Sequence, residues 1–446
     1  EAEGGYHLVL APPGCGKTQI LTERILRARK AGVAPEDMLS LTFTNRAARG
    51  MLERLQTYAD LDDIGAVYVG NVHRYCSKFL FDNALIPAET SIIDDDDAFS
   101  IVARICDDDE QAAKRDFQRK RNYQTIILFA HFMQQIRSHH DRELRMHPEC
   151  LSADDVVALR KICEVQQRQF NHEMMVDVYE HADDYRVACQ GEAYDIGVLR
   201  FIQQLLRKME LAYAYERYMR DNHLMDFEDL LIFAYDALCN DTEGLYHRYS
   251  WVQIDEVQDL NLMQMRIIDM LTARKDFTVM YLGDEQQAIF SFLGAQLGQL
   301  QLLKQRCEGH ILTLGKNYRS PKYLLDVFNT YAEQELGVDA SLLPESSQDI
   351  EHDKFALVLT DNQTVDNEKD RVIKMINYYL GFDDERVAIL VPTNAAADRI
   401  SQKLTNEGIT HFKISGTDMF KTKSYKTLSS FFCVNVNDFN HLAWAR

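Results

Sequence analysis

The stretch APPGCGKT, from Ala11 to Thr18, constrains the fold of this chain more than any other feature. An apolar run from Tyr6 to Leu10 precedes it, and residues 18–29 follow it with helix formers and apolar side chains on one side. A strand, a glycine-rich turn and a helix in this order are typical of a loop that binds the phosphates of a nucleotide. Gly14 and Gly16 give the backbone the freedom to point its N–H groups at a phosphate chain.

The side chains of this loop predict a site for ATP and Mg²⁺. Lys17 can reach the β- and γ-phosphates, and Thr18 can ligate Mg²⁺. Ala11 replaces the first glycine of the G-x-x-x-x-G-K-[ST] pattern. A chance Gly-Lys-Thr in a surface turn is the alternative, but the flanking strand and helix argue against it. The predicted nucleotide-binding residues of the loop are Ala11, Pro12, Gly14, Cys15, Gly16, Lys17 and Thr18.

Strands alternate with helices beyond this loop, which predicts an α/β fold with parallel sheets and helices on both faces. The expected strands are residues 38–44, 251–255 and 277–284, and later 355–360 and 387–393. Ligands on such sheets bind at the carboxyl ends of the strands. Residues 82–225 read as an inserted helical region, and the closing stretch from residue 424 also reads as helical.

Composition narrows the class of protein. The 446 residues carry a formal net charge of −20, which argues mildly against a nucleic-acid binder, although a local basic groove can sit on an acidic body. The nine cysteines form no C-x-x-C pair, as expected of reduced thiols rather than a metal or disulfide framework. No apolar run approaches ~20 residues and no signal peptide is recognisable, so we expect no membrane span and a cytoplasmic protein. His139, His140 and Asp141 are interpreted as a solvated helix end.

Three further motifs follow predicted strands. In IDEVQD, Asp255 is expected to hold Mg²⁺, and Glu256 to position or deprotonate the attacking water. In LGDEQQAIFSFLGA, Gln286 or Gln287 could sense the γ-phosphate.

Phe290 and Phe292 of the same motif share one face of an extended segment. They suit stacking on unpaired bases, with a place in the core as the alternative. In GKNYRSP, Arg319 could stabilise charge on the γ-phosphate, or be an ordinary surface arginine.

With these motifs in this order, the chain resembles the UvrD/Rep/PcrA family of superfamily 1 DNA helicases over essentially its whole length. Besides the four motifs above, LTFTNRAARGM (residues 41–51) resembles the family's T-F-T-N-K-A-A motif, VGNVHRYC (69–76) its G-T-F-H segment, and LMDFEDLL (224–231) its D-F-x-x-L-L stretch. The resemblance implies two RecA-like P-loop NTPase motor domains, each with a helical insertion. Residues 1–82 and 222–308 would form the first motor domain around the insertion 83–221, residues 309–416 a partial second motor domain, and residues 417–446 the start of its insertion.

The family implies specific roles for residues of this sequence. Lys17, Glu256, Gln287 and Arg319 would be catalytic, with Gln287 on the γ-phosphate and Arg319 one of two arginine fingers. Thr18 and Asp255 would hold Mg²⁺, and Tyr318 would stack on the adenine. Single-stranded DNA would follow a track lined by Phe43, Asn45, His73, Phe290 and Phe292.

Departures from the family pattern affect both ligands. Gln19 stands where the family usually carries an Arg that lies under the adenine, and Leu293 stands where an Arg usually follows the aromatic that is Phe292 here. The glutamine motif that precedes the first strand and the late motifs with the second arginine finger do not occur in this sequence. We therefore expect this chain alone to hydrolyse ATP poorly and not to unwind DNA.

The functional prediction is an ATP-dependent 3′-to-5′ DNA helicase or translocase of repair or recombination. Its expected partners are single-stranded DNA, single-strand/duplex junctions and repair or recombination proteins, with a monomer in isolation. The alternatives are the motor part of a RecB/AddA-like helicase-nuclease, and an ATP-controlled module that binds single strands and displaces proteins without unwinding. Loss of Lys17 or Glu256 would mark the last alternative, and both are present.

Overall fold

The computed structural model describes residues 4–58, 65–109, 116–190, 196–284, 297–351, 356–358, 365–379, 386–413 and 423–436. The chain divides into two units, Glu1–Ile350 and Glu351–Arg446.

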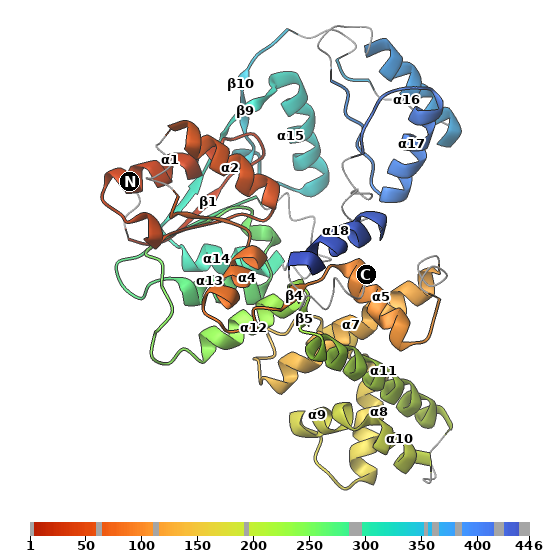
Figure 1. Cartoon of the computed structure of the whole chain (residues 1–446). Helices are drawn as coiled ribbons and strands as arrows, with labels where there is room; N and C mark the ends of the chain where they lie inside the picture. Colours follow the sequence, from red (N-terminus) through yellow and green to blue (C-terminus); the bar gives the residue numbers. More distant parts are fainter. Residues whose placement is uncertain are drawn as a thin grey trace. The chain divides into compact units, whose positions relative to one another are not determined.

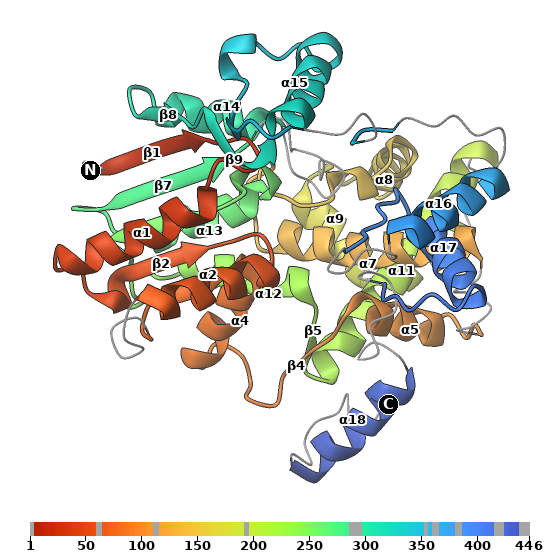
Figure 2. The same ribbon diagram turned by 90° about the horizontal axis from the view of Figure 1, so that it is seen from above.

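A six-stranded sheet forms the centre of the first unit, with every pair of neighbouring strands parallel (Figures 1 and 2). The strand order is β3-β2-β6-β7-β1-β8. The strands are β1 (Gly5–Leu10), β2 (Met38–Leu41), β3 (Tyr68–Gly70), β6 (Trp251–Ile254), β7 (Thr278–Gly283) and β8 (Ile311–Thr313). This confirms the predicted parallel α/β fold. Strand β8 joins the first sheet although it follows residue 309, where we predicted the second motor domain to begin.

Helices cover both faces of this sheet because the buried strands carry apolar side chains on each side (Figure 1). One apolar core joins the sheet to α1 (Lys17–Lys30) and α2 (Asn45–Tyr58). The other joins it to α4 (Val72–Asp82), α12 (Phe227–Cys239), α13 (Leu262–Leu271) and α14 (Leu297–Arg306). A short helix, η1 (Pro35–Asp37), leads into β2, and η3 (Val257–Asp259) follows β6.

The register of the strands brings their carboxyl ends to one edge. Leu10 is opposite Gly283, and Leu41 is opposite Ile254. Strand β2 ends at Leu41, three residues before the predicted end at Thr44. Beyond this end, the N–H of Thr42 still donates to the carbonyl of Gly70 on β3 (2.9 Å). The loops after β1, β2, β6 and β7 therefore share this edge.

The chain leaves the sheet domain for a helical region and returns to it at the same place. Strands β4 (Ser91–Ile92) and β5 (Leu224–Met225) pair in parallel where the chain departs and returns. Between them lie α5 (Asp95–Ile105), α7 (Phe117–Arg137), η2 (Pro148–Cys150), α8 (Ala153–Val165), α9 (His172–Glu180), α10 (Ala182–Gln190) and α11 (Ile196–Asp221). Side-chain capping boxes begin α5, α8, α12 and α13, because an acidic or polar side chain there binds the otherwise unpaired N–H groups of the first turn.

The interpretation of His139, His140 and Asp141 as a solvated helix end is wrong for His140. His140 is only 4% exposed, and its Nε2 pairs with Asp236 of α12, while its ring packs edge-on against Tyr235. His139 and Asp141 are exposed, as expected of a solvated helix end, but His140 is packed against the sheet domain.

The first unit closes with a small parallel pair, β9 (Lys316–Pro321) and β10 (Glu345–Gln348), together with α15 (Lys322–Leu336) and η6 (Ala340–Leu342). The second unit contains α16 (Val365–Tyr379), α17 (Asn394–Asn406) and α18 (Lys423–Val436). Ile373, Ile376 and Leu404 form the core between α16 and α17.

Residues 386–391 take part in no sheet that the structure describes, and Leu390 is 94% exposed, so the strand predicted over 387–393 is wrong there. A strand is stable only when a neighbour completes its hydrogen bonds, and the apolar pattern alone cannot supply one. The boundaries after residues 82, 221, 308 and 416 stay predictions. No helix in the described ranges is long and apolar enough to cross a membrane.

Candidate nucleotide and nucleic-acid site

The phosphate loop follows β1 at the shared edge of the sheet. The N–H of Ala11 bonds to the carbonyl of Gly283 (3.0 Å), so the loop starts from a fixed ladder position. Gly14 and Gly16 have φ values of 79° and 86°, a left-handed conformation that residues with a Cβ rarely adopt. Gly16 is the N-cap of α1, whose first residue is Lys17. Unpaired N–H groups and the helix dipole at this end favour a bound anion.

Lys17 and Glu256 meet across 239 residues of sequence. The Nζ of Lys17 lies 2.9 Å from Oε2 of Glu256, and the two side chains are 11% and 27% exposed. The same carboxylate oxygen accepts a hydrogen bond from Nε2 of Gln258 (2.9 Å), while Oε1 of Gln258 accepts from the N–H of Asp284 (3.1 Å). Gln258, to which we gave no role from the sequence, thus links the loops after β6 and β7.

Carboxylates beside this pair fit a divalent cation. Asp255 is buried, and its N–H bonds to the carbonyl of Leu41 (2.8 Å). Burial, then the charge of Glu256, raises the pKa of Asp255 to about 6. The pKa of Asp259 rises to about 6 for the same two reasons, and its Oδ1 is buried without a hydrogen-bond partner. Mg²⁺ prefers hard oxygen ligands such as these carboxylates.

The N-Y-R-S segment lies directly on the phosphate loop. The N–H of Tyr318 donates to the carbonyl of Gly14 (2.9 Å), and Nδ2 of Asn317 donates to the carbonyl of Pro13 (2.8 Å). A Cβ added to Gly14 would lie 2.9 Å from the Cβ of Arg319. Arg319 is therefore held beside the loop with its side chain exposed, and its role on the γ-phosphate stays a prediction.

The remaining nucleotide-site predictions are spread more widely. Cys15 is buried in the loop, Gln19 bonds to Glu23 on α1 (3.4 Å), and Tyr318 is 57% exposed. The side chains of Thr18 and Gln19 are half-buried in the first turn of α1. Gln286 and Gln287 lie outside the described residues.

Three predicted DNA-binding residues gather at the neighbouring strand ends. Phe43 follows β2 and packs half-buried on the core, and Asn45 begins α2. Oδ1 of Asn45 accepts a bond from Asn71, the residue that caps α4 (3.1 Å), and His73 lies on the first turn of α4. Phe290 and Phe292 lie outside the part of the chain that the structure describes.

Phe227 belongs to this group, although we did not select it from the sequence. It is 48% exposed, and its ring meets that of His73 edge-on at 6.0 Å. Burial lowers the pKa of His73, which keeps its ring neutral at pH 7. An exposed aromatic beside a neutral imidazole can stack on an unpaired base. The available signal was an apolar side chain directly after the N-cap Asp226, where solvent-exposed residues are usual.

A buried cluster of acids and histidines lies behind Phe227. His131 of α7 places Nε2 2.9 Å from Oδ2 of Asp226 and Nδ1 2.9 Å from Oε2 of Glu228. Burial opposes a charge on His131, but these two carboxylates raise its pKa well above the usual value. One atom each of His131, Asp226 and Asp229 lies within 4.8 Å of the others, yet ion pairs and capping bonds already engage these side chains. The cluster therefore anchors the helical region to the strand-end group.

Replacing Asp229 with Asn is expected to stabilise the protein at high pH. Burial, then the charge of Asp226, raises the pKa of Asp229 to about 8, against about 3.9 in an unfolded chain. The folded state then holds a proton that the unfolded state lacks, so stability falls as pH rises from about 4 to about 8. Asn cannot lose a proton, and its oxygen still accepts the capping bond from the N–H of Asp226.

The melting temperature of the Asp229→Asn variant relative to wild type should rise between pH 5.5 and pH 8.5, by at least about 2 °C. Taking the difference from wild type removes most of the contribution of His131, Glu228, His147 and Tyr215, which also face this cluster or its members. Asp97→Asn, at the same capping position of α5, is the matched control and should show no such trend. A pH-independent difference for Asp229→Asn would contradict the expectation.

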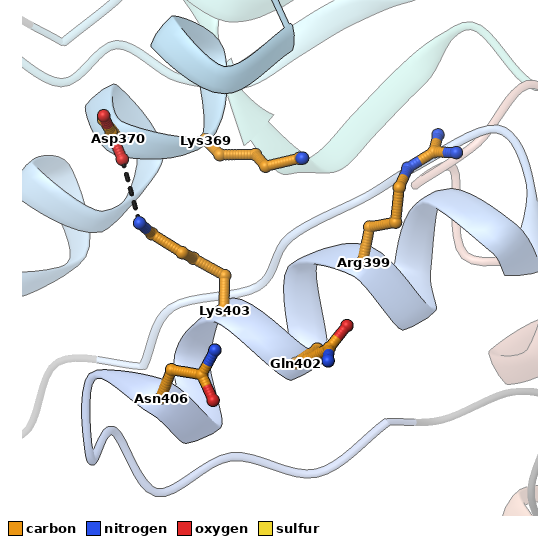
Figure 3. A pocket seen from close by; sticks show the side chains of 6 residues that line it. All are labelled: Lys369, Asp370, Arg399, Gln402, Lys403 and Asn406. Atoms are coloured by element: carbon orange, nitrogen blue, oxygen red, sulfur yellow. Dashed lines mark ion pairs between the residues drawn. The ribbon is translucent and has the colours of Figure 1, made fainter.

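The second unit contains a separate polar pocket of about 370 Å³ on α16 and α17 (Figure 3). Lys369, Arg399 and Lys403 line it with Asp370, which pairs with Lys403 (3.1 Å). None of the lining residues is among those predicted to bind ATP or DNA.

Family models match nearly the whole chain. The UvrD/REP helicase N-terminal domain matches residues 1–308, and the UvrD-like helicase C-terminal domain matches residues 312–446. The chain belongs to the UvrD/Rep helicase family. This assigns the six-stranded sheet and its phosphate loop to the RecA-like fold of that family and confirms the resemblance drawn from the motifs.

Relatives within the UvrD/Rep family are distant. The chain is 24% identical to the DNA helicase II of Rickettsia typhi over 99% of its own length and 59% of that protein. It is 23% identical to the ATP-dependent DNA helicase PcrA of Staphylococcus aureus, over 99% of its own length and 53% of that protein. The chain thus spans between half and three-fifths of the length of these curated relatives.

Proposed function

We propose that this UvrD/Rep-family protein couples ATP hydrolysis to 3′-to-5′ movement on single-stranded DNA, in repair or recombination. One observation carries the proposal: a single sheet edge bears both the Lys17–Glu256 pair at the phosphate loop and the group of Phe43, His73 and Phe227. Strands β1 and β6, which lead to the first, are continuous in the sheet with β2 and β3, which lead to the second. The family and the names of its relatives as DNA helicases support DNA as the track.

The nucleotide half of the mechanism begins with an exchange of partners. Lys17 leaves Glu256 for the β- and γ-phosphates of ATP, which frees the Glu256 carboxylate to orient a water and accept its proton. Gln258 keeps a hydrogen bond to that carboxylate and so fixes its position during the exchange. Asp255 and Thr18 would hold Mg²⁺, which when bound neutralises charge on the phosphates. Arg319, and by the family pattern Gln287, would face the γ-phosphate.

The DNA half of the mechanism depends on stacking rather than on a broad basic surface. A net charge of −20 disfavours wide electrostatic contact with DNA. Exposed aromatic rings bind bases with little regard for sequence, so a motor can step along any strand. Phe227 begins α12, and Phe43 follows β2. Both elements pack in the core, so small shifts of either would change how these rings contact the DNA strand.

The test is steady-state ATP hydrolysis with and without oligo(dT), by a chain that also carries the family's glutamine motif and late motifs, with Lys17→Ala as the control. Strong stimulation by the oligonucleotide that disappears in Lys17→Ala is the expected result. Arrival of the protein at a labelled 5′ end, and not at a labelled 3′ end, would support the direction. Turnover that ignores DNA, or none in the wild type, would rule out a motor and leave an ATP-controlled binding module.

A further inference from the structure

Asn317 is a buried polar residue in an otherwise exposed stretch. It is 2% exposed, whereas Lys316, Tyr318 and Arg319 around it are all exposed. A buried amide must form hydrogen bonds to offset the free-energy cost of leaving water. The hydrogen-bond partners of the Asn317 amide therefore indicate the role of this residue.

The Asn317 amide bridges two segments that are 304 residues apart. Its Nδ2 donates to the carbonyl of Pro13 (2.8 Å), and its Oδ1 accepts from the N–H groups of Arg319 and Ser320 (2.8 Å each). The carbonyl can only accept and the N–H groups can only donate, so these partners also fix which end of the amide is which. One side chain thus fixes the backbone of β9 around Arg319 and ties this strand to the phosphate loop.

Strand β10 also holds β9 through side-chain hydrogen bonds. Oγ of Ser347 donates to the carbonyl of Asn317 (2.9 Å), and Nε2 of Gln348 donates to the carbonyl of Tyr318 (2.8 Å). The contact with the loop uses only backbone atoms of Pro13 and Gly14, so it needs no bound nucleotide to form. Other bonds hold the segment together, and the side chain of Asn317 ties it to the loop.

We propose that Asn317 is the positioning residue that holds Arg319 in register with the phosphate loop, and so sets the rate of the hydrolytic step. The inference rests on the proposed function, since Arg319 must act on the γ-phosphate for its position to matter. Asn317 itself touches neither phosphate nor water in this role. It acts through Arg319, as a group whose loss misplaces a charge that is needed in the transition state.

The experiment is a double-mutant cycle of Asn317→Ala and Arg319→Ala in the chain that also carries the glutamine motif and the late motifs, measured as ATP hydrolysis with saturating oligo(dT). Asn317→Ala should lower kcat by about tenfold to a hundredfold, with KM for ATP changed less than about threefold. Arg319→Ala should lower kcat more. The double variant should be no slower than Arg319→Ala alone, because a missing guanidinium cannot be misplaced.

Two further variants separate positioning from folding. Asn317→Asp keeps an oxygen for the N–H groups of Arg319 and Ser320 but cannot donate to Pro13, so its kcat should fall as in Asn317→Ala. Asn329→Ala is the matched control, since its amide donates to the carbonyl of Pro344 (2.9 Å) in the same region without touching the loop. Its kcat should stay at the wild-type value.

The outcomes distinguish this inference from the proposed function. Independent, multiplicative losses from Asn317→Ala and Arg319→Ala, or a wild-type kcat for Asn317→Asp, would overturn the positioning role while leaving the ATPase intact. An Arg319→Ala variant with wild-type kcat, or a wild-type protein without turnover, would refute the proposed function and the positioning role with it. Loss of folding in Asn317→Ala, seen by circular dichroism, would leave Asn317→Asp to decide.

Discussion

Replacing Glu256 with Gln is expected to lower kcat for ATP hydrolysis by about 10²–10⁴-fold, the contribution typical of a general base. Gln has the size of Glu and can still accept a hydrogen bond from Lys17 and Gln258, which both reach Oε2 of Glu256 at 2.9 Å. It cannot take a proton from water. The affinity for ATP should therefore survive, and a fluorescent ATP analogue should bind with a dissociation constant near that of the wild type.

Asp259→Asn is the control for this variant, measured at saturating Mg²⁺ because Asp259 is one of the carboxylates that fit a divalent cation. Asp259 lies in the same loop, and burial, then the charge of Glu256, raises its pKa as they do that of Asp255. If any nearby carboxylate could serve as the base, the two variants would lose similar activity. A fall in kcat that is confined to Glu256→Gln would identify Glu256 as the base. Equal losses, or an unimpaired Glu256→Gln, would place the proton acceptor elsewhere.

The sequence predicted the parts of the site that depend on local pattern. The strand before Ala11, the helix from Lys17 and the acids after β6 each follow from residues close together in the chain, and the family model supports the order of these motifs. The end of β2 was predicted too late, because Thr42, Phe43 and Thr44 are β-branched or aromatic and suit a strand, whereas β2 ends at Leu41. Polar contacts between distant segments could not be predicted at all.

Asn317 and His131 show why. Each is an ordinary polar residue in its own segment, and its importance comes from partners far away in sequence, Pro13 for the first and Asp226 with Glu228 for the second. Neither the spacing of charges nor a hydrophobic period encodes such a pair, since chain folding alone brings the partners together. The same holds for Phe227, whose exposure beside His73 depends on α4 and α12 packing together.

Replacing Gly14 with Ala is expected to reduce both the stability of the protein and its rate of ATP hydrolysis. Gly16→Ala is the matched control for this variant. Both glycines have a left-handed backbone, so alanine at either position should cost about 1–2 kcal/mol in backbone strain. Only at Gly14 does the added methyl group meet neighbours, the side-chain atoms of Asn317 at 2.8–2.9 Å and the Cβ of Arg319 at 2.9 Å. At Gly16 it meets nothing within 4 Å.

The difference between the two variants therefore measures the contact of the loop with the N-Y-R-S segment. Urea unfolding without nucleotide should show Gly14→Ala less stable than Gly16→Ala by about 1–3 kcal/mol, the usual cost of overpacking. At saturating ATP, where weaker binding no longer limits the rate, kcat of Gly14→Ala should fall at least about a hundredfold, because the methyl group pushes Arg319 away from the phosphates. Gly16→Ala should lose less at saturation, since its methyl group displaces neither Asn317 nor Arg319. Equal losses in the two variants would mean that backbone strain alone decides, and that the segment carrying Arg319 does not depend on close contact with Gly14.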